Sequence, residues 1–252
     1  MLVPRWLFLY LWIAPHALLA VLAIMMLRRK LVRQFPVFFT YTVFEVVQFV
    51  LLFTLARVTR TGQPYFVVWV IGGAGSIGLR FALVQEIFRN VFQSYPALQQ
   101  FGSVLFRWAT AVLMIVAVAL VAYSSGTELD RFTIALTIVD RAVLIVQCGL
   151  LVLLLLLAGF LSFPWTSYAF SIALGLGLYA SLELAVSALR AHFGVETSLA
   201  LFDAISMGAY HCCVLFWVVA LLLPERVAKG MRPAPTNELE HWNTALQRLL
   251  HQ

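Results

Sequence analysis

Charged residues are scarce in this chain: Asp, Glu, Lys and Arg make up 11% of its 252 residues, against 63% that are hydrophobic. A soluble domain carries about a quarter charged residues, because its surface must face water. The mean hydropathy here is +0.95. So few charged residues cannot cover a folded chain of this length. The composition therefore excludes an ordinary soluble protein and predicts one that is surrounded by lipid.

Lysine and cysteine are also rare. Neither lysine, Lys30 or Lys229, lies in an apolar segment, which excludes a pigment held as a Schiff base within the membrane. The three cysteines, Cys148, Cys212 and Cys213, lack the spacing of a zinc site. Adjacent residues of a helix point about 100° apart, so no disulfide is expected between Cys212 and Cys213. We expect all three cysteines to act as small buried side chains.

Long apolar runs fill the chain. A spanning helix needs about 20 mostly apolar residues, and seven segments qualify: 5–27, 36–57, 65–90, 101–123, 132–158, 168–189 and 198–223. The breaks between them are short and polar, and most contain Pro or Gly. Helices satisfy their own backbone hydrogen bonds in lipid. The sequence therefore predicts an all-α bundle of seven transmembrane helices over residues 1–223, followed by a cytoplasmic tail over 224–252.

Basic residues predict the orientation of this bundle. Nine lie on the side that holds the first loop, the third loop and the tail: Arg28, Arg29, Lys30, Arg33, Arg89, Arg226, Lys229, Arg232 and Arg248. Five lie on the other side: Arg5, Arg57, Arg60, Arg131 and Arg190. Cytoplasmic loops carry the excess of Lys and Arg. We therefore expect a plasma or inner membrane protein whose N-terminus is outside and whose C-terminus is cytoplasmic.

The tail carries the segment "TNELEHWNTALQRLLHQ", in which the apolar residues fall near one helical face. Asn237 and Glu240 have the spacing of a helix-capping pair. This pattern predicts a short amphipathic helix over residues 237–251. Such a helix lies on the inner membrane surface or docks on a partner protein.

Ionisable residues inside the predicted helices are the main functional signal. A charge at the bilayer centre costs about 2.5–3.5 kcal/mol, so such residues face the bundle interior and pair. Residues at steps of three and four support this: Tyr41, Glu45 and Gln48 share one face of their helix. We expect Arg141 to pair with Glu183 or Asp203 in an outer layer. Arg80 and Arg107 are expected to pair with Glu45 and Glu86. By depth, Asp140 also belongs to the outer layer, whereas Arg80, Glu86 and Arg107 belong to an inner layer and Glu45 and His211 lie near the middle.

These residues give two sets of candidate sites. The candidates for binding or proton relay are Glu45, Asp140, Arg141, Glu183 and His211, and the candidates for inner charge pairs are Arg80, Glu86 and Arg107. Buried pairs also serve simply to fix helix register, which is the structural alternative. The glycine-rich stretch "WVIGGAGSIGLRF" lies within a span and has no preceding strand, so it predicts close helix packing and no nucleotide site.

Three classes of function fit this sequence. A small-solute or proton-coupled transporter is favoured by polar groups of both signs inside the membrane. It is also favoured by a faint internal repeat, in which Phe-Pro precedes the spans starting at 36 and 168. A seven-helix receptor that signals through a partner and a structural membrane subunit are the alternatives. The sequence contains no enzyme, cofactor, metal or nucleic-acid signature. The partners that we expect are the lipid bilayer and a small polar ligand or proton.

Overall fold

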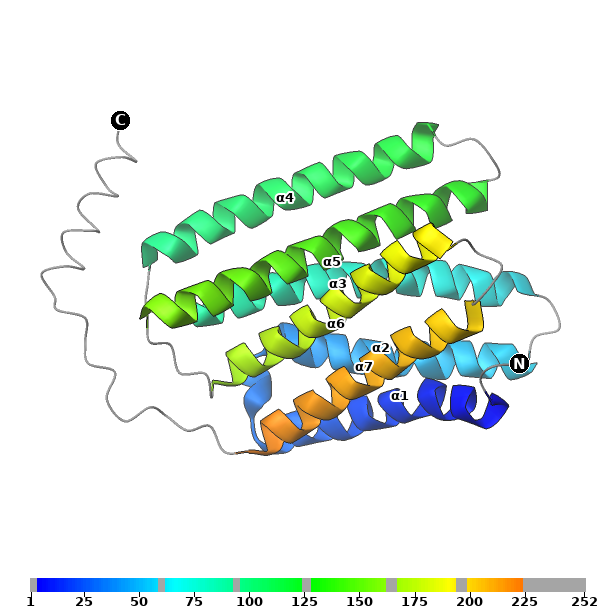
Figure 1. Ribbon diagram of the computed structural model, residues 1–252, viewed down its shortest axis with the longest axis horizontal. Coiled ribbons are helices and arrows are strands. Elements are labelled where there is room, and N and C mark those ends of the chain that lie inside the picture. The colour runs from blue at the N-terminus through cyan, green and yellow to red at the C-terminus, as the bar shows by residue number, and fades with distance from the viewer. Residues whose placement is uncertain are drawn as a thin grey trace, which may run out of the picture.

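Seven α-helices make up the chain in its computed structural model, which describes residues 4–58, 62–92, 96–123, 128–161, 167–193 and 199–223. No strand occurs in these ranges. The helices are α1 (Arg5–Arg28), α2 (Pro36–Val58), α3 (Gly62–Val91), α4 (Pro96–Tyr123), α5 (Glu128–Leu161), α6 (Tyr168–Phe193) and α7 (Leu199–Leu222), with a 3₁₀ turn η1 (Leu31–Arg33) after α1. The predicted all-α bundle is confirmed (Figure 1). The predicted amphipathic helix over 237–251 lies outside the described residues.

The helices are those of a membrane-embedded protein. In the described part of the chain, six of them are long and apolar enough to cross a bilayer, namely α1, α2, α3, α5, α6 and α7. In α4 a shorter apolar stretch, Phe106–Val116, is found. Large hydrophobic side chains such as Trp6, Ile71 and Ile115 are about 70% exposed on the outside of the bundle. Such a surface is stable only in contact with lipid.

Several helices run further than their apolar segments. The predicted bounds 65–90, 101–123 and 132–158 become Gly62–Val91, Pro96–Tyr123 and Glu128–Leu161. A helix pairs its own backbone groups whatever its side chains are, so polar flanking residues continue it beyond the apolar core. Pro36 and Pro96 occupy the first positions of α2 and α4, where a missing N–H is harmless.

Two matched halves form the bundle. In the first, α1 packs on α2 and α2 on α3; in the second, α5 packs on α6 and α6 on α7. The halves meet where α1 packs on α7 and where α3 packs on α5 and α6. Helix α4 links them and lies at one edge, beside α5 (Figure 1). The internal repeat suggested by the Phe-Pro motifs stays a prediction.

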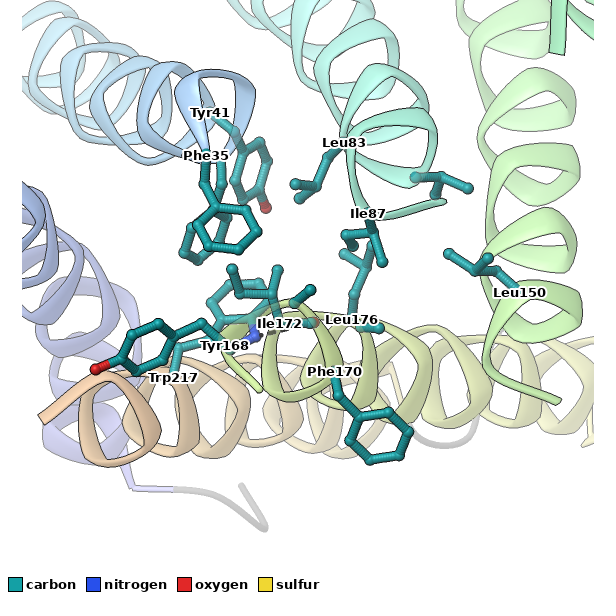
Figure 2. Close-up of a cluster of buried hydrophobic side chains, with 14 of the residues drawn as sticks. Phe35, Tyr41, Leu83, Ile87, Leu150, Tyr168, Phe170, Ile172, Leu176 and Trp217 are labelled. Atoms are coloured by element: carbon teal, nitrogen blue, oxygen red, sulfur yellow. Dashed lines mark hydrogen bonds between the residues drawn. The ribbon is translucent and has the colours of Figure 1, made fainter. Parts of the chain in front are cut away.

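A hydrophobic cluster holds α1, α2, α3, α5, α6 and α7 together near one end of the bundle (Figure 2). Trp217 is at its centre: its ring lies edge-on to Phe38, with 5.1 Å between ring centroids, and its Nε1 donates to the carbonyl of Ile172 at 3.2 Å. Gly175 makes room for this indole, because a Cβ there would lie 2.4 Å from Nε1 of Trp217. The cluster fixes the helices from which the polar interior is built.

The same end carries a contact between the first loop and α7. Arg29 donates from Nη1 to the carbonyl oxygen of Leu221 at 2.6 Å and from Nη2 to that of Leu222 at 2.8 Å. These carbonyls belong to the last turn of α7, which has no further helical partner for them. The chain turns at Lys30, whose φ of 58° ends α1. The basic first loop and the C-terminal end of α7 therefore lie on one side of the bundle.

Candidate functional site

An ion pair inside the bundle joins α3 to α5. Arg80 donates through Nη2 to Oδ1 of Asp140, and the two side chains are 11% and 32% exposed. The prediction that Arg80 pairs with Glu45 or Glu86 is wrong. Because α5 packs along α3, Arg80 and Asp140 meet at one depth, so their assignment to separate layers is wrong as well.

Glu45 is fixed by its neighbour on α3. Ser76 donates its hydroxyl hydrogen to Oε1 of Glu45. Three residues further along α2, Gln48 lies against Gly72, where an added Cβ would come within 2.4 Å of Nε2 of Gln48. The Oε1 of Gln48 is buried and has no hydrogen-bond partner among the described residues. The predicted close packing of the glycine-rich stretch is thus confirmed at Gly72.

Three tyrosines from three helices surround this pair of contacts. Tyr41 of α2 and Tyr179 of α6 both lie close enough to Arg80 to interact with it electrostatically. Tyr210 of α7 approaches Tyr41 and Glu45, and its ring lies edge-on to that of Tyr179 with 5.5 Å between centroids. We use the name interior polar cluster for the following residues: Tyr41, Glu45, Ser76, Arg80, Asp140, Tyr179 and Tyr210.

Glu183 lies beside the cluster, one turn beyond Tyr179 on α6. It is half-buried and interacts electrostatically with Tyr179. Its Oε2 is buried without a hydrogen-bond partner, and no ion pair in the described ranges includes it. The cluster and its border therefore hold three carboxyl groups, those of Glu45, Asp140 and Glu183, but only the guanidinium of Arg80.

Arg141 is not part of this arrangement. Its side chain is exposed and forms no ion pair with a described residue. Neighbouring residues of a helix point about 100° apart. Because Asp140 faces α3, the next residue points away from the interior. The predicted pairing of Arg141 with Asp203 is wrong: Asp203 accepts from Nη2 of Arg190 at 2.7 Å, in an exposed pair between α6 and α7.

His211 lies at the second interface between the halves. It is buried, and its Nε2 lies 3.3 Å from the hydroxyl oxygen of Tyr10 on α1. Its Nδ1 is buried without a partner among the described residues. His211 follows Tyr210 directly on α7, so its ring points away from the face that carries the cluster. A polar contact thus occurs at each interface: Arg80 with Asp140, and Tyr10 with His211.

Glu86 and Arg107 have other roles than the predicted charge pairs. The two carboxylate oxygens of Glu86 accept the backbone N–H groups of Val37 and Phe38, at 2.8 and 2.9 Å. These donors belong to the first turn of α2, which has no helical partners for them. Glu86 therefore caps α2 from a neighbouring helix. Arg107 is exposed on α4 and forms no ion pair with a described residue.

A cavity of about 200 Å³ lies next to the cluster, between α1, α2 and α3. It is lined by Trp12, His16, Glu45, Gln48, Phe49, Leu52, Tyr65 and Trp69. A larger cavity of about 560 Å³ lies between α3, α4 and α5 and has an almost wholly apolar wall. Within the described ranges, no three His, Cys, Asp or Glu side chains converge as metal ligands do. Glu45 is the residue shared by the cluster and the small cavity.

Sequence reasoning missed part of this site. Tyr41 shares its predicted polar face with Glu45 and Gln48, which is a sequence signal for one tyrosine of the cluster. Nothing in the sequence around Tyr210 marks it. The cysteines are free, as predicted, but only Cys213 is buried, whereas Cys148 is half-buried and Cys212 is exposed.

Comparison of the chain with protein-family models, curated proteins and solved structures finds no match.

Proposed function

We propose that this chain is a proton-coupled transporter of a small polar solute, in which the two halves of the bundle move against each other. Transporters built from repeats place their substrate and coupling sites near the middle of the membrane, where the repeats meet. Arg80 and Asp140 belong to different halves and pair at such an interface. A movement that separates α3 from α5 must break this pair. The Asp140 carboxylate is then free to bind a proton, so proton binding is coupled to the movement.

The charge balance of the interior carries this proposal. Glu45 and Asp140 share a single arginine, Arg80, and Glu183 beside them has no ion pair in the described part of the chain. An ionised carboxylate without a partner is costly inside a membrane. The carboxyl groups in excess of Arg80 are therefore expected to hold protons or a bound cation. Exchange of those protons is the step that a transporter couples to solute movement.

Measurement of solute-driven proton movement tests the proposal. The purified chain is reconstituted in vesicles that contain a pH-sensitive dye and is given an inward gradient of choline, glucose or succinate in turn. We expect one of the three to change the internal pH, and the Asp140→Asn variant to abolish that change. The exposed Asp203→Asn variant is the matched control and should behave as the unmodified chain does. If none of the three solutes moves protons, the transport proposal fails; saturable binding without flux would favour a receptor.

We also propose that the N-terminus of the chain is outside and its C-terminus is cytoplasmic. The contact of Arg29 with the last turn of α7 supports one part of this, since it puts the first loop and the end of α7 on one side. That side carries the excess of basic residues, as cytoplasmic sides do. A reporter fused after Gln252 that is active only in the cytoplasm tests the orientation.

A further inference from the structure

The small cavity at Glu45 has an unusual wall. Besides Glu45, it consists chiefly of aromatic side chains from three helices: Trp12, Phe49, Tyr65 and Trp69. Aromatic rings carry negative charge on their faces and attract cations within about 6 Å of the ring centre. No lysine or arginine lines the cavity. The wall therefore presents negative charge from the carboxylate of Glu45 and from the faces of its aromatic rings.

The remaining polar groups of this wall include donors and acceptors: the hydroxyl of Tyr65 and the amide of Gln48 can do both, and His16 offers one ring nitrogen as an acceptor. His16 has its Nδ1 at 2.8 Å from the carbonyl oxygen of Trp12. A carbonyl only accepts, so Nδ1 carries the hydrogen and Nε2 of the neutral ring is left as an acceptor. Gln48 also lines the cavity, but its Oε1 is buried, so a ligand cannot reach that atom. The cavity thus offers one ring acceptor, Nε2 of His16, to a ligand that brings its own donor.

We propose that this cavity binds a small organic cation, an ammonium ion with a hydrogen-bond donor close to its charge. The carboxylate of Glu45 would compensate the charge, the aromatic rings would surround the ammonium group, and Nε2 of His16 would accept from the donor. A cavity of about 150 Å³ holds benzene. The volume here, about 200 Å³, is thus suited to a ligand of about seven to nine non-hydrogen atoms.

The chemistry of the wall argues against an inorganic cation. Hard metal ions take six or more oxygen ligands. This cavity supplies at most the oxygens of Glu45 and Gln48, with Tyr65 as the only hydroxyl, and the rest of its surface is carbon and ring nitrogen. Aromatic cages of this kind suit quaternary ammonium groups, which have no N–H to be hydrated and spread their charge over several carbons.

The inference rests on the proposed function in one respect, because it names the class of substrate that such a transporter would carry. Glu45 belongs both to the cavity and to the interior polar cluster, where Ser76 holds it. Its carboxylate can be neutralised by a proton or by the ammonium ion, but not by both. Binding of the cation would then release the proton, and the two would be exchanged across the membrane.

Choline and its neutral carbon analogue 3,3-dimethylbutan-1-ol form the matched pair of probes, because they share size and hydroxyl group and differ in charge. The full chain is titrated with each by calorimetry, in a detergent that lacks an ammonium headgroup. We expect saturable binding of choline and none of the alcohol. Equal binding of both would overturn the proposal, since shape and not charge would then be recognised.

Variants locate the binding. Glu45→Gln removes the charge from the cavity wall and is expected to weaken choline binding roughly 10- to 100-fold. Trp69→Leu removes one ring from a side chain that is 43% exposed, so this variant is expected to fold, and binding should weaken roughly 3- to 30-fold. Asp203→Asn neutralises an acid remote from the cavity and should leave the affinity unchanged. Unchanged affinity in both cavity variants would overturn the proposal.

Two further measurements show whether the bound cation is a free solute or a lipid headgroup, and whether the site takes part in transport. Titration in nanodiscs of phosphatidylglycerol measures a free cation; if phosphatidylcholine in the disc blocks choline, the occupant is a lipid headgroup of the same ammonium chemistry, which supports the cation site. Choline binding without any proton-linked flux would support this site and contradict the proposed transport. Flux driven by glucose or succinate, with no choline binding, would contradict this site and support transport.

Discussion

Arg80 of α3 and Asp140 of α5 form an ion pair across one of the two interfaces at which the halves of the bundle meet. At the other interface, Tyr10 of α1 and His211 of α7 face each other at 3.3 Å. The two halves are thus joined by polar contacts on both sides of the bundle. The hydrophobic cluster also joins the halves, since Trp217 of α7 packs on Phe38 of α2, so opening the bundle would break apolar as well as polar contacts.

The ion pair is expected to behave as a unit in stability measurements. Arg80→Gln leaves the Asp140 carboxylate without its partner and should lower the free energy of unfolding in detergent by about 3 kcal/mol. Asp140→Asn should do much the same. The double variant should cost less than the sum of the two, because it leaves no orphaned charge. Strict additivity of the two single changes would show that the pair contributes nothing to stability.

The glycines of α3 provide a matched comparison. Gly72→Ala places a methyl group 2.4 Å from Nε2 of Gln48 and is expected to destabilise the bundle by about 1–3 kcal/mol. Gly78→Ala meets nothing within 4 Å. This control should be neutral or stabilising by up to about 1 kcal/mol, because alanine favours the helix. Thermal unfolding of the two variants in one detergent decides the point, and equal melting temperatures would contradict the close packing at Gly72.

Glu86 is expected to stabilise the start of α2. Glu86→Ala leaves the backbone N–H groups of Val37 and Phe38 without their acceptor, which should cost about 1–3 kcal/mol. Amide hydrogen exchange should speed up at these two residues before it does elsewhere in α2. Glu86→Gln retains one acceptor oxygen and should lose less. Unchanged exchange at Val37 and Phe38 in the alanine variant would rule out the cap.

Arg29 is expected to hold the last turn of α7. Arg29→Ala removes both donors to the carbonyls of Leu221 and Leu222, and the loss should be about 1–3 kcal/mol. Arg28→Ala is the control, since it changes the adjacent exposed arginine, which ends α1. Urea or heat unfolding followed by circular dichroism compares the two. Equal loss in both variants would mean that total charge matters here and the specific contact does not.

The fold could be predicted from the sequence because it depends on long apolar runs, whereas the pairing inside the bundle could not. Asp140 and Arg141 illustrate the difference: they are adjacent in the sequence, but the helix points them about 100° apart, and only packing decides which one faces α3. Glu86 looks like a charge partner, yet its acceptors serve backbone groups of α2, which composition cannot show. The cavity at Glu45 needs α1, α2 and α3 in place before Trp12 and Trp69 share a wall.

Access to the interior polar cluster from both sides of the membrane is the most direct test of a transport function. The three native cysteines are replaced by serine or alanine, and Ser76→Cys places a single thiol beside Glu45. A membrane-impermeant thiol reagent is then added to either side of reconstituted vesicles. If the chain is a transporter, the thiol reacts with reagent added to either side of the membrane, and addition of solute changes the rates of labelling. A thiol that reacts from neither side would contradict transport and leave the cluster a structural feature of the bundle.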